Sequence, residues 1–166
     1  MFEPWCRRTA DVGCCGLIAG AAPGDVALAA PHRLIVDARG GFRGVVIADE
    51  GAGRADLDAG EHARLTDAAT AAGHALGAVG YRGPFGIDAF RWRDGTGAER
   101  FHPLCEINAR LTFGWVARAW AERLGEPVAL FVGPGPGPGR PRGRMLLGAA
   151  EDDRTTAWLE PPTSQR

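Results

Sequence analysis

Oxygen-bearing side chains alternate along one short stretch of this sequence. Glu106, Asn108 and Arg110 are spaced by two residues. Side chains two apart on a β-strand point to the same face, so a carboxylate, an amide oxygen and a guanidinium would lie together. The residues that alternate with them are apolar or small, as a strand that packs on a core requires: Cys105, Ile107 and Ala109.

A further carboxylate lies on the segment before this one. The run Asp94–Gly97 separates two strand-like segments and predicts a β-hairpin. A loop centred near the last glycine of that run would place Asp88 opposite Glu106, with Cβ atoms about 4.5–5.5 Å apart. A tighter turn centred near Thr96 would shift the partner of Asp88 to about Pro103. We favour the looser loop.

Two ionised carboxylates so placed require compensation. At about 4 Å they repel by roughly 4 kcal/mol at an effective dielectric of about 20, which a shared proton, a nearby arginine or a bound cation would offset. Oxygen ligands from Asp88, Glu106 and Asn108 suit Mg²⁺ or Mn²⁺, and Mg²⁺ commonly takes its remaining ligands from water and nucleotide phosphates. Arg110 could then hold a phosphoryl oxygen by two parallel hydrogen bonds. The alternative is a solvated surface hairpin. The polar residues inside an otherwise apolar strand argue against it, because buried polar groups need partners.

The same residues carry a resemblance. The segment 80–88 ends in Gly-Ile-Asp and the segment 103–110 contains Glu-Ile-Asn-Ala-Arg; together they resemble the C-terminal core of ATP-grasp proteins. The resemblance implies that Asp88, Glu106 and Asn108 hold Mg²⁺ on the phosphates of ATP. It implies that Arg110 contacts the transferred phosphoryl group, and that a small carboxylate is activated as an acyl phosphate for attack by an amine or a similar nucleophile.

The likeness extends over residues 3–132. Glu3 resembles a residue after the hinge of ATP-grasp domains that contacts the nucleotide ribose, although it could equally be an acidic residue beside a chain end. The segment 37–44 resembles the strand–turn–strand of that family. Its Arg39 and Arg43 could face the nucleotide or an anionic substrate, or be solvated turn residues.

The chain departs from the family in lacking one lobe. That lobe normally supplies phosphate-binding lysines and a glycine-rich loop, whereas all 19 basic residues here are arginines. We therefore expect half of a site, with little or no ligase activity unless another chain supplies the N-terminal lobe. The competing hypothesis is a truncated, non-catalytic module that binds a partner chain.

The supporting elements predict an α+β fold. Asp58, with Glu61 three residues later, predicts a helix start; apolar residues recur at helical spacing as far as Val79, and Gly80 is placed to end the helix. A second helix is predicted over 113–124. The remaining short, turn-linked apolar segments predict an antiparallel β-sheet packed with these two main helices, as in the C-terminal lobe of an ATP-grasp domain.

Three segments divide the chain. Residues 1–132 are predicted to form the partial ATP-grasp-like domain. The Gly-Pro repeat that begins at Gly133 excludes helix and ladder, so 133–142 is predicted as a linker. Residues 143–166 are predicted as a short edge strand and a loose tail on which Trp158 could dock.

Composition sets the broad class. With 166 residues, 45% of them hydrophobic, the chain suits a globular protein, and a net charge of −1 gives no field that attracts nucleic acid. No run of 18 apolar residues or signal-peptide pattern occurs, so no membrane partner and a cytoplasmic location are expected. The four cysteines match no zinc spacing and are expected to be reduced, which leaves a redox or zinc protein as a third option: Cys6, Cys14, Cys15 and Cys105.

Overall fold

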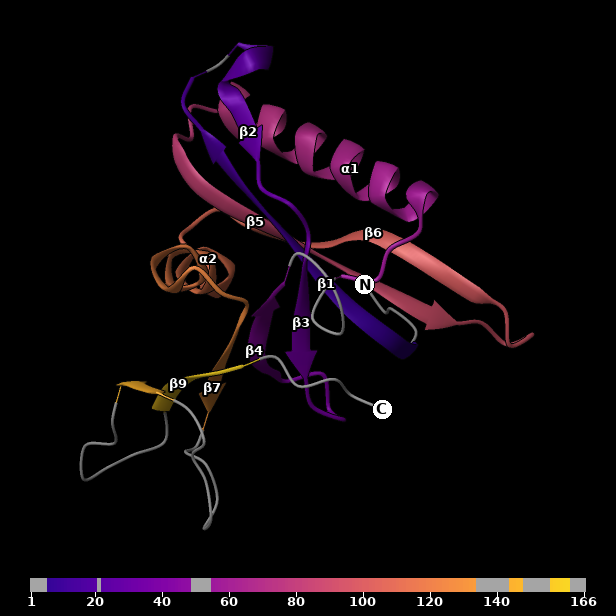
Figure 1. The fold of residues 1–166 in the computed structure, drawn as a ribbon. Helices are drawn as coiled ribbons and strands as arrows, with labels where there is room; N and C mark the ends of the chain where they lie inside the picture. The colour runs from indigo at the N-terminus through magenta and orange to yellow at the C-terminus, as the bar shows by residue number, and fades with distance from the viewer. Residues whose placement is uncertain (1–5, 21, 49–54, 134–143, 148–155, 162–166) are drawn as a thin grey trace. The chain divides into compact units, whose positions relative to one another are not determined.

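The computed structural model describes residues 6–20, 22–48, 55–133, 144–147 and 156–161. The chain forms two compact units. The first comprises Met1–Pro31 and Asp56–Thr112, and the second comprises His32–Ala55 and Phe113–Arg166. Each unit contains antiparallel strands and one α-helix, which confirms the predicted α+β class (Figure 1).

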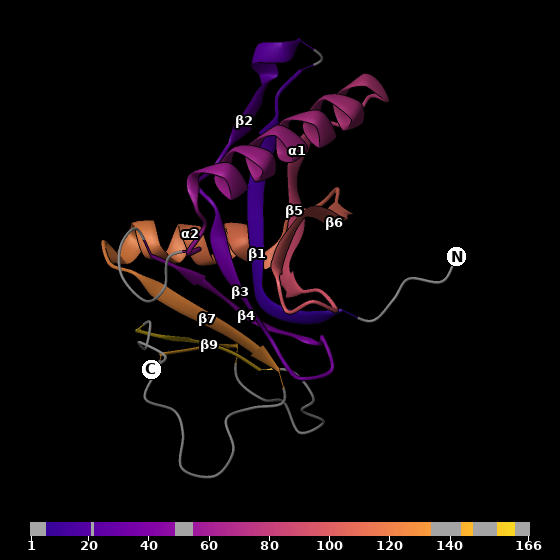
Figure 2. The ribbon, with the colours of Figure 1, turned by 90° about the vertical axis from the view of Figure 1, so that its right-hand side faces the viewer.

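The first unit is a helix on a small antiparallel sheet. Its strands run in the order β6-β5-β1, and β2 also pairs with β1. Helix α1 lies along one face of these strands (Figures 1 and 2). The elements are β1 (Arg7–Ile18), the 3-10 helix η1 (Pro23–Asp25), β2 (Val26–Leu28), α1 (Ala59–Ala78), β5 (Gly83–Arg93) and β6 (Glu99–Asn108).

Helix α1 begins where the sequence predicts. The Asp58 side chain accepts a hydrogen bond from the Glu61 N–H at 2.8 Å, and the Glu61 carboxylate accepts one from the Asp58 N–H at 3.2 Å. This reciprocal capping box satisfies two N–H groups that a helix end leaves unpaired. Leu65 is fully buried on the sheet side, whereas Val79 lies beyond the last helical residue and is exposed.

A glycine inside α1 lets the helix approach the sheet closely. A Cβ at Gly73 would lie 2.6 Å from Val26 Cγ1 and 3.1 Å from Phe85 Cζ. Because Phe85 is fully buried, its ring could not move away from such a Cβ without displacing the core. Glycine at position 73 lowers the helix propensity of α1, and the close packing that it allows offsets this cost.

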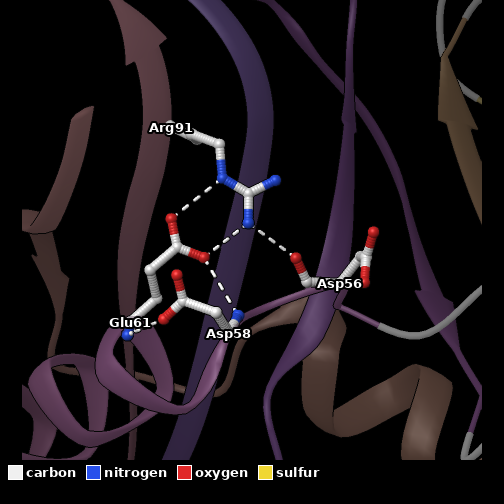
Figure 3. A network of polar contacts seen from close by, with 4 residues as sticks. All are labelled: Asp56, Asp58, Glu61 and Arg91. Carbon is white, nitrogen blue, oxygen red and sulfur yellow. Dashed lines mark hydrogen bonds and ion pairs between the residues drawn. The ribbon is translucent and has the colours of Figure 1, made fainter. Parts of the chain in front are cut away.

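A polar network ties the start of α1 to strand β5 (Figure 3). The Arg91 guanidinium donates through Nε to Glu61 Oε1 at 2.9 Å and through Nη2 to Glu61 Oε2. The same Nη2 donates to the backbone carbonyl of Asp56 at 2.6 Å. Together with the capping contacts between Asp58 and Glu61, this bidentate pair sets the position of the helix on the sheet.

The second unit is built in the same way around α2. Its strands run in the order β3-β4-β7-β9-β8, all antiparallel. Helix α2 packs on β4 and β7 over a core that includes Val45, Ala117 and Leu130. The elements are β3 (His32–Val36), β4 (Phe42–Ile47), α2 (Phe113–Leu124), β7 (Val128–Gly133), β8 (Arg144–Leu147) and β9 (Thr156–Glu160).

The C-terminal part of the chain contains two strands. β8 lies where an edge strand was expected, and β9 adds a strand within the segment expected to be a loose tail. Trp158 is buried and its ring stacks on that of Phe131, with centroids 5.4 Å apart. Most of the expected 133–142 linker lies outside the described residues. None of the helices in the described ranges has the length and apolar character needed to cross a membrane.

Candidate functional site

The β5–β6 hairpin brings Asp88 and Glu106 directly opposite one another, as predicted. The reason differs from the one expected. Near the turn, Arg93 pairs with Glu99, which centres the loop on Thr96 and corresponds to the tighter of the two turns considered. The Asp94 carboxylate closes that turn by accepting hydrogen bonds from the backbone N–H groups of Thr96 and Ala98.

A β-bulge restores the predicted pairing. Phe90 pairs with His102 and Asp88 pairs with Glu106, so one intervening residue on β5 faces three on β6. Pro103 lies in this bulge and has no N–H to donate to the ladder, which accounts for the irregularity at this point. The bulge shifts the register by two residues and thereby carries Glu106 to Asp88.

The two carboxylates lie on the sheet face opposite α1. Phe85 and Ile87 are fully buried on the α1 side, so the alternating residue Asp88 points to the other face. On that other face Gly13 of β1 lies opposite Asp88, and Gly86 lies opposite both Asn108 and Cys15. The list of residues that share this face is Asp11, Gly13, Cys15, Gly86, Asp88, Phe90, Glu106 and Asn108.

Gly86 has a steric reason to lack a side chain. A Cβ there would lie 2.9 Å from Thr112 Cγ2, so Thr112 packs directly over its backbone. The Thr112 hydroxyl also lies 3.6 Å from Cys15 Sγ. This packing fixes the segment that follows Asn108, from which Arg110 projects.

The expectation of a core beneath the other side of β6 is wrong. Ile107 is 44% exposed, and Cys105 and Ala109 are also exposed. The reason is that β6 pairs, among the described strands, with β5 alone, and that the hydrogen bond from α1 reaches this strand at Phe101, far from Ile107. An alternating pattern predicted the correct faces but could not indicate how far the helix extends over them.

The electrostatics of Asp88 mark this face as unusual. The pKa of Asp88 is raised from 3.8 to about 6, first by burial and then by the nearby carboxylates of Glu106 and Asp11, against the opposing effect of Arg110 and Arg8. In the described part of the chain, neither Asp88 nor Glu106 has a side-chain hydrogen bond or ion pair. Negative charge is therefore concentrated here without direct compensation.

Asn108 and Arg110 are brought together as the alternation predicts. Arg110 donates from Nη2 to Asn108 Oδ1 at 2.7 Å, and Asn108 is buried to 9% exposure. A carbonyl oxygen has two lone pairs, so Asn108 Oδ1 can accept from Arg110 and still offer an oxygen to a cation. Arg110 is exposed and its remaining donors are available to an anion.

Two site residues were missed. Asp11 is only 7% exposed, and its Oδ1 accepts from Arg8 Nη1 at 2.8 Å. Arg8 also lies with its guanidinium carbon 4.2 Å from the centre of the Phe90 ring. An acidic residue directly before the apolar run of β1 was the available signal, because a carboxylate in a buried strand needs a partner.

The other predicted contacts belong to the second unit or fall outside the described residues. Glu3 is outside the described residues. Arg39 is exposed in the turn between β3 and β4 of the second unit, and Arg43 is engaged there with Asp37, which accepts from its Nη2 at 2.7 Å. Backbone N–H groups of Gly41 and Arg39 lower the pKa of Asp37, and Arg43 lowers it further, so this acid organises the turn.

The donor set fits a hard divalent cation. Within the described ranges, no three side chains of His, Cys, Asp or Glu are arranged to hold a metal, and no disulfide joins the cysteines there. Mg²⁺ needs fewer protein ligands, because one or two carboxylates suffice when phosphates and water supply the rest. Asp88, Glu106 and the Asn108 oxygen could provide that set, and a cation would offset the burial and the carboxylate repulsion that together raise the Asp88 pKa.

Comparison with known proteins identifies the fold. No protein-family model matches the sequence, and no curated protein matches it. N5-carboxyaminoimidazole synthase from Aspergillus clavatus, solved with ADP and 5-aminoimidazole ribonucleotide, is 14% identical with a TM-score of 0.57 over 96% of this chain and 48% of its own. The Staphylococcus aureus synthetase, solved with ADP, is 9% identical with a TM-score of 0.57 over 95% of this chain and 47% of its own. The fold is that of part of an ATP-grasp enzyme.

A second kind of ATP-grasp enzyme shows the same similarity. Biotin carboxylase from Campylobacter jejuni, solved as a β-γ-ATP complex, is 13% identical with a TM-score of 0.55, over 95% of this chain and 42% of its own. The chain thus spans about half the length of the solved structures it matches. An ATP-grasp fold over nearly the whole chain confirms the family resemblance at the level of architecture, and the activity of the site is a separate question.

Proposed function

We propose that the first unit binds a divalent cation, Mg²⁺ or Mn²⁺, together with ATP, as the metal-binding portion of an ATP-grasp ligase site. Asp88 and Glu106 would hold the cation, with Asn108 as the third protein ligand. The observation that carries this proposal is the cross-strand pairing of Asp88 and Glu106, neither of which has an ion-pair partner among the described residues.

The cation and Arg110 would both act on the phosphates of the nucleotide. A bound cation would neutralise and align the nucleotide phosphates. Asn108 holds Arg110 at the edge of the site, where its exposed guanidinium can bind a phosphoryl oxygen of ATP or of an acyl phosphate. Glu3, Arg39 and Arg43 remain proposed contacts to the nucleotide or to an anionic substrate.

The reaction class follows from the fold resemblance. We infer activation of a small carboxylate as an acyl phosphate, followed by attack of an amine or similar nucleophile. Because the chain spans about half the length of the matched structures, we propose that a second lobe, on another chain or another segment, completes the clamp. Phosphoryl transfer depends on positioning and charge stabilisation, so this chain alone is expected to have little or no ligase activity.

A non-catalytic module is the second candidate. Several apolar side chains of the first unit are exposed, among them Leu111 at 61%. Such residues would suit contact with a partner chain. A stable complex with a lobe-supplying protein in which Mg²⁺-ATP fails to bind would favour this alternative.

The test is a titration of Mg²⁺-ATP by calorimetry. We expect Glu106→Gln and Asn108→Ala each to weaken binding by about tenfold or more, the loss expected for removing a charge-assisted contact. Glu99→Gln is the matched control, because Glu99 lies on the same strand but pairs with Arg93 beside the turn. Equal binding by the parent and the Glu106 variant would rule out the proposed metal site.

A further inference from the structure

A second irregularity in the sheet brings an arginine onto the face that carries the acids. Arg8 pairs with Trp92 and Ala10 pairs with Arg91, so Thr9 is an extra residue on β1. Without this bulge, Arg8 and Ala10 would point to the same side of the sheet. The bulge turns Arg8 onto the face of Asp11, which lies three residues away and makes the ion pair at 2.8 Å.

The Arg8 guanidinium is held on two sides. Asp11 accepts its hydrogen bond from within the sheet, and the ring of Phe90, directly opposite Asp11, lies beneath the guanidinium at 4.2 Å. An aromatic face attracts a cation, so Phe90 and Asp11 together favour one position of a side chain that otherwise has many. Arg8 thus has a defined place although it is near the start of the strand.

The Arg8 guanidinium lies beside the two proposed metal-ligand carboxylates, Asp88 and Glu106, and is not paired with either of them. Gly13 lies opposite Asp88, and Asp11 lies two residues before Gly13, which makes Asp11 a diagonal neighbour of Asp88 at about 7–8 Å between Cα atoms. The positive charge of Arg8 acts on Asp88, and the charge of Asp11 acts in the opposite direction. Among the described residues, the ion pair of Arg8 is with Asp11.

We infer that Arg8 and Asp11 form a neutral positioning pair that sets the affinity of the proposed cation site. Asp11 and Phe90 hold the Arg8 charge close to Asp88 and Glu106, but prevent Arg8 from pairing with these two acids in place of the cation. This inference rests on the proposed function. Arg8 is a positioning residue, since it acts on the cation through space and through Asp11. Removing its charge tightens cation binding, and removing Asp11 weakens it, because Arg8 is then free to pair with Asp88.

The experiment measures binding of Mn²⁺ alone to the whole chain, by titration at constant ionic strength and pH. Arg8→Gln is expected to tighten binding by about threefold or more, the effect of a unit charge several ångströms away. Asp11→Asn is expected to weaken binding by at least about threefold for the same reason. The double variant is expected to lie within about twofold of the parent, because it removes a neutral pair.

Two controls separate charge from structure. Arg7→Gln removes the same charge from the neighbouring residue, which lies opposite Arg93 on the other face and should change Mn²⁺ affinity much less. Circular dichroism and the thermal midpoint show whether the buried Asp11 variant folds. Should it not fold, Arg8→Gln and Arg8→Lys are compared, and restoration of the parent affinity by lysine supports a charge effect.

The outcomes distinguish the two proposals. If the parent binds Mn²⁺, Glu106→Gln abolishes binding and Arg8→Gln leaves the affinity unchanged, the positioning role is refuted and the metal site stands. If Arg7→Gln and Arg8→Gln tighten binding equally, the effect is one of net charge, and the positioning role is again refuted. If the parent binds no Mn²⁺ in the absence of nucleotide, the positioning role is refuted, and the separate Mg²⁺-ATP titration decides the proposed function.

Discussion

The two faces of the first unit contain the same kinds of charged residue but use them differently. On the α1 side, Arg91 and Glu61 form a bidentate pair whose side chains are only 19% and 13% exposed. The hydrogen bond from Arg91 lowers the pKa of Glu61, and the Asp58 backbone N–H adds to this. The charges of Arg91 and Glu61 compensate each other, and this pair joins a helix to a strand (Figure 3).

On the opposite face the charges do not balance in the same way. Asp88 and Glu106 face each other across the hairpin, Asp11 lies nearby, and the pKa of Asp88 is raised to about 6. Arg8 is committed to Asp11. The comparison teaches that a bidentate arginine lowers an acid's pKa and makes a structural pair, whereas burial beside other carboxylates raises an acid's pKa and leaves the charge that the proposed cation would offset.

The largest expected effect is on the α1 side. Arg91→Met should lower the free energy of unfolding by about 2–3 kcal/mol, because it leaves the Glu61 carboxylate poorly solvated and without its main partner. Urea unfolding measures this change. The control is Arg93→Met, whose contact with Glu99 is 3.7 Å long and half-exposed, and which should cost under about 0.5 kcal/mol. Equal losses in the two variants would mean that the α1 network is no more than a surface ion pair.

On the opposite face, removing a charge should raise the free energy of unfolding. The pKa of Asp88 is raised by folding, from 3.8 to about 6, so its ionised form is disfavoured in the native state and stability is lost as pH rises through 6. Asp88→Asn should therefore raise the free energy of unfolding at pH 8 by about 1–3 kcal/mol and change it little at pH 4. Thermal unfolding at both pH values with a chelator present measures this, with exposed Asp67→Asn as the control. A loss of stability at pH 8 would contradict the idea of uncompensated charge.

The smallest effect concerns the cap alone. Asp58→Ala removes the acceptor for the Glu61 N–H and should lower stability by about 1 kcal/mol. Asp58→Ala and Arg91→Met both remove contacts of Glu61, so their losses should differ from the sum by at least about 0.5 kcal/mol. A double variant measured by urea unfolding tests this, and strict additivity would show that cap and ion pair act independently.

Much of the local structure could be predicted from the sequence. The Asp58–Glu61 capping box indicated the start of α1, and α2 runs over the predicted residues Phe113–Leu124. Both signals work because they depend on residues within one turn or one helical face of each other. The alternation along β6 likewise placed Glu106 and Asn108 on one face.

The register could not be predicted in this way. The pairing of Asp88 with Glu106 was predicted for the wrong reason, since the loop is tight and the bulge around Pro103 supplies the missing shift. Arg8 and Asp11 were missed because only the bulge at Thr9 brings them to one face. A bulge depends on how two distant strands compete for hydrogen bonds, and one strand's sequence does not contain that information.

The sequence by itself determined which residues could bind a cation and which short segments could form helices, because those properties belong to side-chain chemistry and local periodicity. The tertiary structure decided which carboxylates lie opposite one another, which arginines form ion pairs with acids and which arginines have donors left for a ligand. Asp88 and Glu61 are both acids near arginines in the folded chain, yet their pKa values move in opposite directions. The physical reason is that a pKa depends on burial and on charges brought near from other strands, and both arise only when the sheet has formed.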